Sequence, residues 1–399
     1  MLIETILAVA SGIFLGIITG LTPGVHINLV AAILLALSAR LSGFISTYYL
    51  AVSILAMSIT HVFLDSIPSV FLGAPDTDQV LTVLPGHRLL LNGTGYKAVA
   101  LISLGALCAI LLAIIISPLT IIFIKKTFEL IRPYIGIILI IVSILLIIKE
   151  QKSKFWAFIL FCMSGILGLA VFNIHSLREP LFPMLSGLFG ISTLIISISE
   201  KAIIPIQYKI FPKLGIWKAG GLTLLATVAS SLFSFLPGLG PTQATILASS
   251  LAKNLQSESF LFLNGGINAV NMLTSVLSLY AIDKARNGSI VIISKMIELT
   301  KENLVIFLII AAVTAIIAFF LSLLLALLFA KMITKINYSW LCTGIIAFVV
   351  ALVFYFSGFV GLLVLTSATL LGIIPSIKGA GKNHLMGCLL IPVISYFIL

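Results

Sequence analysis

Charged residues are scarce in this chain. Only 9% of its 399 residues are Asp, Glu, Lys or Arg, and only 12 are acidic. In their place, 61% of the residues are hydrophobic and the mean hydropathy is +1.28. Apolar runs of about 17–25 residues, the length of a membrane-spanning helix, recur throughout. A soluble core does not need that much apolar surface. The sequence therefore indicates an all-α, multi-pass protein of the cell membrane.

Catalytic and cofactor-binding patterns are also missing. The chain has no Ser-His-Asp set, no HExxH, no P-loop and no paired intramembrane carboxylates, which excludes an intramembrane enzyme and an ATP-driven pump. Its four cysteines are widely spaced in or beside apolar runs and show neither disulfide nor metal-ligand spacing. We therefore expect no catalytic residue, no metal site and no cofactor beyond a coupling Na⁺ or H⁺.

The net charge of +11 is carried by short loops without interleaved aromatic residues. Such loops orient the chain and contact anionic membrane lipids, so no nucleic acid partner is expected. The positive-inside rule places four basic loops in the cytoplasm: 149–154, 200–213, 331–335 and 378–384.

The apolar runs predict about eleven or twelve spanning helices and two broken ones. The first run begins at Leu2 with Glu4 as its only charge, so we expect a retained first span and not a cleaved signal. The predicted runs are 2–21, 25–39, 44–64, 98–124 with a kink at Pro118, 133–149, 155–172, 184–199, 215–236, 242–252, 259–280, 303–330, 338–356, 358–375 and 384–398.

Two segments interrupt apolar runs at corresponding points. In the second, Pro237, Gly238, Gly240 and Pro241 fall within five residues, and such a cluster breaks a helix. In the first, Thr22-Pro23-Gly24 stands at the same point, followed by His26 and Asn28 where the second copy has Gly240 and Thr242. Paired broken helices in an apolar chain are the best pointer from sequence to a transporter's binding site.

A helix that restarts after such a break presents unpaired backbone N–H groups and the positive end of its dipole. Two such ends form an anion site without Lys or Arg, and neither broken segment contains either residue. The alternative is that both breaks only kink helices to fit a bundle. The predicted substrate-binding residues are Thr22, Pro23, Gly24, His26, Asn28, Pro237, Gly238, Gly240, Pro241, Thr242 and Gln243.

Other polar residues are candidates for coupling or gating, each with a plainer alternative. A membrane histidine is often only a packing residue, loop aspartates often cap turns, an interfacial His-Arg pair is often solvated, and asparagines often join helices. The candidates are His61, Asp65, Asp76, Asp78, His87, Arg88, Asn268 and Asn271.

The two halves of the chain match beyond the breaks. Each broken helix is followed by a span and then by a charged loop that contains Asn-Gly, at Asn92-Gly93 and at Asn287-Gly288. We interpret this as an internal duplication, with residues 1–200 and 201–399 as two transmembrane halves. The span count leaves open whether the halves are parallel or inverted.

The segments GIITGLTPGVHIN, PSVFLGAPDTDQVLTVLPGHRLLLNGTGYKAVAL and LPGLGPTQATILASSL resemble the large permease subunit of tripartite tricarboxylate transporters, the TctA family, in its stand-alone archaeal branch. Pro237–Thr242 is close to that family's repeated Pro-Gly-x-Gly-Pro-Thr motif. His26-Ile27-Asn28 replaces Gly-Pro-Thr in the first copy, and Leu84–Arg88 stands where the family's loop has Asp-Gly.

The resemblance implies a secondary transporter of citrate-like carboxylates that works with a small membrane subunit and an extracytoplasmic binding protein. It leaves a homo-oligomer open. The breaks also resemble those of a membrane family that returns polyprenyl phosphate carriers across the bilayer, and a phosphate head group suits the same helix ends. The leading hypothesis is thus alternating-access transport of a di- or tricarboxylate. Polyprenyl-phosphate translocation is the second hypothesis, and a non-transporting membrane scaffold is the third.

Overall fold

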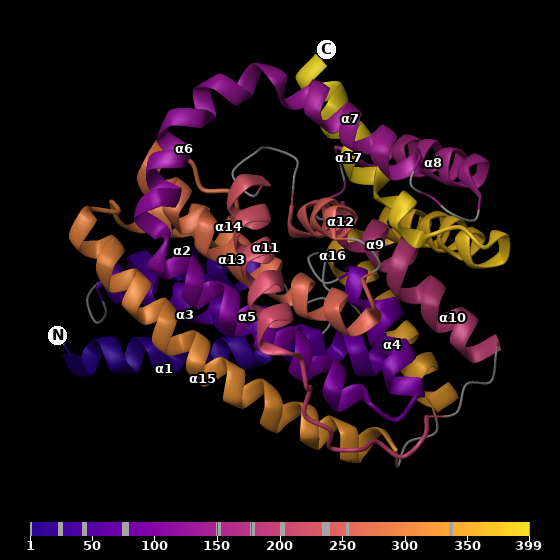
Figure 1. Ribbon diagram of the computed structural model, residues 1–399, viewed down its shortest axis with the longest axis horizontal. Coiled ribbons are helices and arrows are strands. Elements are labelled where there is room, and N and C mark those ends of the chain that lie inside the picture. Colours follow the sequence, from indigo (N-terminus) through magenta and orange to yellow (C-terminus); the bar gives the residue numbers. More distant parts are fainter. Residues whose placement is uncertain are drawn as a thin grey trace.

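The computed structural model describes residues 2–22, 27–41, 46–73, 80–148, 150, 153–175, 177, 180–199, 204–233, 240–252, 255–334 and 338–398, and the regular secondary structure in these ranges is helical (Figure 1). The helices and short helical turns are α1 (Leu2–Leu21), α2 (Ile27–Leu41), α3 (Thr47–Leu64), η1 (Pro68–Leu72), η2 (Val80–Thr82), α4 (Val83–Leu91), α5 (Gly95–Ile115), α6 (Ser117–Ile131), η3 (Arg132–Tyr134), α7 (Ile135–Ile148), α8 (Lys154–Phe172), α9 (Leu181–Leu185), η4 (Ser186–Ile191), α10 (Ser192–Ser199), α11 (Ile216–Phe233), α12 (Pro241–Leu251), α13 (Ser257–Ile282), α14 (Gly288–Met296), α15 (Lys301–Ile333), α16 (Tyr338–Lys378), η5 (Lys382–Met386) and α17 (Gly387–Ile398).

Within the described ranges, eight helices are long and apolar enough to cross a membrane, or nine if α6 and α7, bent by 94° at their junction, count as one span. This confirms the multi-pass helical class. The number is below the expected eleven or twelve because the runs at 184–199 and 384–398 form helices shorter than a span, and 133–149 yields a helix of only 14 residues. The predicted run 98–124 is interrupted at Ile116, two residues before Pro118, where α5 ends at Ile115 and α6 begins at Ser117.

Helix α16 also joins two runs that the sequence separates. Its 41 residues contain one non-helical position, Gly358, with φ +62°. A straight helix of that length would measure roughly 60 Å, about twice the hydrocarbon thickness. The kink at Gly358 splits it into two arms, each of about 20 residues and long enough to span. Glycine stands here because positive φ is disfavoured for other residues.

The protein buries polar as well as apolar side chains, and many of its large apolar side chains face outward, as expected in a bilayer. All residues of α3 from Leu50 to Leu64 are buried, and they include Ser58, Thr60 and His61. Helix α15 is more apolar than α3, yet less than half of it is buried, and its outward side chains include Phe320. Lipid contact explains the hydropathy of α15, while α3 packs against protein on all sides.

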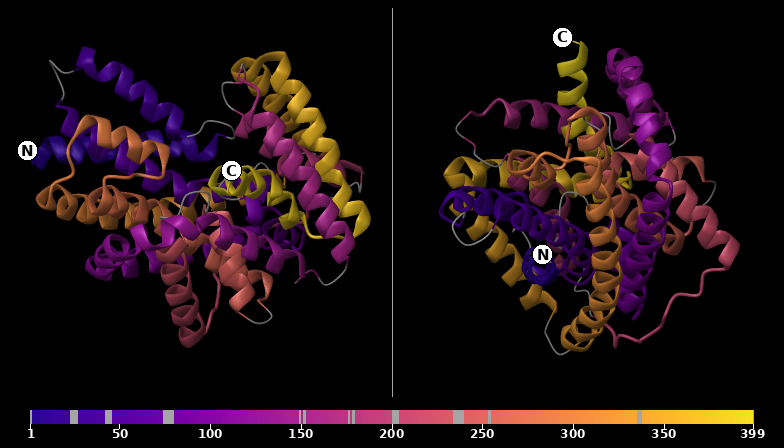
Figure 2. Two further views of the ribbon diagram at one scale, coloured as in Figure 1. Left: turned by 90° about the horizontal axis from the view of Figure 1, so that it is seen from above. Right: turned by 90° about the vertical axis from the view of Figure 1, so that its left-hand side faces the viewer.

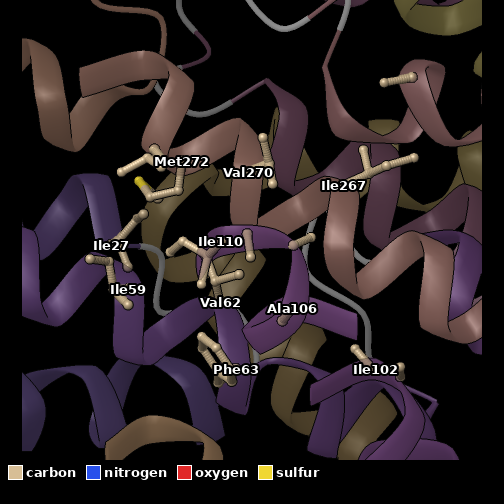
Figure 3. Close-up of a cluster of buried hydrophobic side chains, with 14 of the residues drawn as sticks. Ile27, Ile59, Val62, Phe63, Ile102, Ala106, Ile110, Ile267, Val270 and Met272 are labelled. Atoms are coloured by element: carbon tan, nitrogen blue, oxygen red, sulfur yellow. The ribbon is translucent and has the colours of Figure 1, made fainter. Parts of the chain in front are cut away.

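Helix α1 reaches the buried α3 through small residues. Gly12, Gly16 and Gly20, spaced four residues apart, leave no room for a Cβ because Ser53 O, Thr60 and Leu64 of α3 lie against them. Such small-residue spacing allows close backbone approach between membrane helices. Helices α3, α5 and α13 then enclose an apolar cluster that includes Phe63, Ile110 and Val270 (Figure 3).

The helices form two packing groups, which we call the core group and the peripheral group. The core group contains α1–α6 and α11–α15, and the peripheral group contains α7–α10, α16 and α17. In the left view of Figure 2, indigo α1 and α2 lie at one end of the molecule, and gold α16 lies at the other. Each group takes helices from before and after residue 200.

In the peripheral group, helices from before residue 200 pack against helices from after it. Helix α8 packs on α17, and α16 packs on α9, η4 and α10. At four points a glycine lies so close to the facing backbone that a Cβ would meet its carbonyl oxygen. The four pairs are Gly168 with Cys388, Gly372 with Leu188, Gly187 with Leu365, and Gly387 with Phe161.

Candidate functional site

Helix α12 begins at the second break. Gly240 is its N-cap and carries no side chain, and Pro241 occupies the first turn. The Gly240 N–H donates to Oε1 of Gln243 over 2.9 Å. Thr242 and Gln243 are each 3% exposed. The positive end of the α12 dipole lies at this first turn and therefore faces the break. The predicted contacts Pro237 and Gly238 lie outside the described residues.

A hydrogen bond fixes α12 to α13. Thr245 Oγ1 donates to Oδ1 of Asn264 over 2.9 Å, and both side chains are buried. Asn268 lies one turn further along α13 and is 1% exposed. Its Nδ2 has no hydrogen-bond partner among the residues that the structure describes. Asn271, three residues on, is half-buried. Asn268 therefore lies on α13 one turn from the residue that bonds α12.

Helix α2 begins at the first break in other surroundings. Thr22 ends α1 with its N–H donating to Ile18 O over 3.1 Å. Asn28 is half-buried, and its side chain lies where a Cβ on Gly288, the first residue of α14, would stand. Ile27 is 2% exposed and belongs to the apolar cluster of Figure 3. Pro23, Gly24 and His26 lie outside the described residues.

Helix α13 connects the two restarts. Asn264, Asn268 and Met272 are spaced four residues apart, so they share one face of the helix. Asn264 holds α12, while Met272 belongs to the same apolar cluster as Ile27 of α2 (Figure 3). Asn268 thus lies on the face of α13 between the residue that bonds Thr245 of α12 and the residue that shares an apolar cluster with Ile27 of α2.

Two coupling candidates lie at the first break. His61 and Asp65 are 4% and 3% exposed. The Asp65 N–H donates to His61 O over 2.9 Å, and these backbone atoms lie against Gly20, two residues before Thr22. The structure brings this pair to the end of α1, next to the break.

The remaining candidates for coupling or gating differ in their burial. His87 of α4 is 7% exposed, and burial lowers its pKa to about 4, so it is neutral at pH 7. The neighbouring Arg88 is exposed. The two side chains therefore do not form a paired cationic site. Asp76 and Asp78 lie outside the described residues.

The structure adds a residue that sequence reasoning missed. Lys382 follows α16 in a loop predicted to be cytoplasmic, yet it is 6% exposed. It lies on a cavity of about 330 Å³ between the core and peripheral groups. Ile246 of α12 and Phe260 of α13 line the same cavity, each within one turn of the Thr245–Asn264 hydrogen bond. No local pattern distinguishes Lys382 from other loop lysines, because its burial depends on contacts distant in sequence.

Among the described residues, no group of three or more His, Cys, Asp or Glu side chains is placed to hold a metal ion. The polar groups at the α12 start and on α13 are backbone N–H groups, hydroxyls and amides. Such groups can donate directed hydrogen bonds to an anion.

The sequence matches the model of the tripartite tricarboxylate transporter TctA family over residues 6–387. It is also 29% identical over 400 residues to an uncharacterised protein of Methanocaldococcus jannaschii, with 97% of each chain covered. No solved structure matches the chain significantly. The family comprises transporter permeases, not enzymes, and supplies the large subunit of systems that also have a small membrane subunit and a binding protein. The chain therefore belongs to the tripartite tricarboxylate transporter TctA family.

Proposed function

We propose that this chain is a secondary permease that binds a di- or tricarboxylate at the start of α12, beside Asn268. One observation carries the proposal: Asn268 Nδ2 is a buried donor without a partner among the described residues, one turn along α13 from the asparagine that bonds α12. Leaving a donor buried and unpaired costs about 1–3 kcal/mol. A carboxylate oxygen of the substrate would satisfy it.

The helix start supplies the second part of the proposed site. A carboxylate at the first turn of α12 meets backbone N–H groups and the positive end of the dipole. Neither α12 nor the first two turns of α2 contain Lys or Arg. The anion would be held by dipoles, which release it more readily than a fixed ion pair. That suits a carrier that must bind and release in each cycle.

Alternating access would come from movement of the core group against the peripheral group. Each group contains helices from both 1–200 and 201–399, and the reciprocal glycine contacts support an origin by duplication of these two halves. His61 and Asp65, buried at the first break, are our candidates for coupling to Na⁺ or H⁺. A small membrane subunit and an extracytoplasmic binding protein would deliver the substrate.

A thermal-shift panel on the purified protein in detergent tests the substrate class. The ligands are citrate, succinate, inorganic phosphate and a short-chain polyprenyl phosphate, each with and without sodium. A ligand that binds only the folded state adds about 2.7 kcal/mol of apparent stability at a hundredfold excess over its Kd.

We expect citrate or succinate to raise the melting temperature. A larger shift of the melting temperature in the presence of sodium would identify sodium as the coupling ion. A shift with polyprenyl phosphate alone would overturn the proposal in favour of lipid-carrier transport. A melting temperature unmoved by every ligand would contradict binding at α12 and favour a scaffold.

A further inference from the structure

The Lys382 ammonium is held by hydroxyl groups. It donates to Ser192 Oγ over 3.0 Å and to Thr193 Oγ1 over 2.7 Å. Both acceptors belong to α10 in the peripheral group. These bonds fix the position of Nζ but bring no negative charge. A buried charge without a counter-charge costs several kcal/mol of desolvation.

The nearby carboxylates are already engaged. Glu150 Oε2 lies 2.8 Å from His384 Nε2 and accepts the Gly381 N–H over 3.2 Å. Glu258, next to Ser257 on the cavity wall, pairs with Lys97. Over the described ranges, Lys382 has no ion-pair partner. Burial accordingly lowers its pKa to about 8, so most molecules still carry the charge at pH 7.

The cavity beside Lys382 has the size and lining of a small-molecule site. Its volume of about 330 Å³ lies within the roughly 300–1,000 Å³ typical of such sites. Apolar walls come from Pro85 of α4, Phe189 of η4 and Ile246 of α12, with Ser249 and Asn383 as polar groups. A single cation in a mostly apolar chamber with a few polar groups suits a small organic anion.

We infer that this cavity binds a carboxylate anion, with the Lys382 ammonium as its counter-charge. The inference deepens the proposed function, on which it rests. It adds a charged side chain to a binding site that otherwise consists of a helix N-terminus and uncharged hydrogen-bond donors. Since the walls belong to both helix groups, an anion here would contact both sides of the proposed moving interface.

The plainer alternative is that Lys382 only ties η5 to α10 through the two hydroxyls. The alternatives differ in what Lys382→Met does. If Lys382 has only this structural role, its loss lowers the stability of the ligand-free protein and leaves anion binding unchanged. If it is the counter-charge, the ligand-free protein loses little, because the desolvation cost disappears with the charge, and carboxylate affinity falls at least tenfold.

The test is the citrate-induced thermal shift of wild type, Lys382→Met and Asn268→Leu. Lys331→Met, at an exposed position at the end of α15, is the control for loss of one positive charge. Loss of the shift in Lys382→Met, with the control unchanged, supports the inference. A normal shift in Lys382→Met overturns it, whether or not that variant is less stable.

The Asn268→Leu arm separates the two proposals. If only Asn268→Leu loses the shift, the α12 site stands and the Lys382 inference fails. If only Lys382→Met loses it, the anion binds in the cavity and not at Asn268. Loss in both supports one continuous site. Inorganic phosphate in parallel shows whether the cavity selects carboxylates: an equal shift with phosphate would overturn that selectivity.

A pH series adds a second readout. Wild-type citrate affinity should fall between pH 7 and pH 9 as the ammonium loses its proton. The neighbouring titratable groups, Glu150 with His384 and Glu258 with Lys97, are already paired. Affinity that stays constant to pH 9 would argue against a charge–charge contact.

Discussion

The two restarted helices, α2 and α12, follow similar Pro-Gly segments but begin in different surroundings. Helix α2 starts with Ile27 in an apolar cluster and Asn28 against Gly288 of α14. Helix α12 starts with Thr242 and Gln243 buried, is bonded to Asn264 of α13 through Thr245, and continues along the Lys382 cavity. Sequence similarity between the two breaks therefore does not carry over to their neighbours. Apolar packing dominates around α2, whereas α12 has buried polar neighbours at which we propose that the substrate binds.

The largest expected effect on stability comes from His87 of α4, the helix that lines the cavity beside α12. His87 of α4 is neutral because burial lowers its pKa to about 4, whereas an unfolded histidine titrates near 6.5. The unfolded state therefore binds more protons between these values, and stability falls as pH drops from 6.5 to 4. The loss should reach about 3 kcal/mol. Helix α14, which packs on α2, contains no histidine.

Thermal unfolding across this pH range, in wild type and His87→Gln, checks the prediction. We expect the variant to have a flatter profile below pH 6.5. An identical pH dependence in the two proteins would show that His87 is not buried in its neutral form.

A steric change should break the packing at α2. A Cβ at Gly288 would lie 2.7 Å from Asn28 Cγ, so Gly288→Leu forces the two helices apart at a cost of about 2 kcal/mol. The measurement is the melting temperature, with Ser294→Leu on the exposed side of α14 as the control. Adding Asn28→Ala should recover part of the loss. No recovery in the double variant would mean that α2 and α14 do not meet at these residues.

A polar change should loosen α12. Thr245→Val removes the hydrogen bond to Asn264 while keeping the side-chain shape, at a cost of about 1 kcal/mol. Thr245→Val, Asn264→Leu and the double variant form a cycle in thermal unfolding, and their coupling energy measures the bond. A coupling energy of zero would show that α12 is held by packing alone.

The smallest effect on stability is expected at Asn268, one turn from Asn264. Because its Nδ2 has no partner in the described part of the chain, Asn268→Leu removes an unpaired buried donor. The ligand-free melting temperature should stay level or rise. A clear fall, comparable to that of Thr245→Val, would indicate that Asn268 is a structural residue.

Local signals predicted much of this fold. The run 2–21 matches α1, and the division between 338–356 and 358–375 coincides with the kink at Gly358. These features follow from hydropathy, proline and glycine, which act within a few residues.

The site was predictable only in part. The polar residues at the start of α12 and on α13 were recognised because they follow a break or repeat along a helix. Lys382 was not, because its burial depends on Ser192, Thr193 and α12, which are distant in sequence. Likewise, the difference between α2 and α12 arises from their neighbours and not from the breaks.

The most direct test of the central claim is equilibrium binding of labelled citrate to purified wild type and Asn268→Leu. Thr314→Val, which removes another buried hydroxyl without a partner within the described ranges, on α15, is the matched control. A hydrogen bond to a charged group contributes about 1.5–3 kcal/mol, so we predict at least a tenfold weaker Kd for Asn268→Leu and an unchanged Kd for the control. Citrate binding by Asn268→Leu at wild-type affinity would contradict a substrate site at the start of α12.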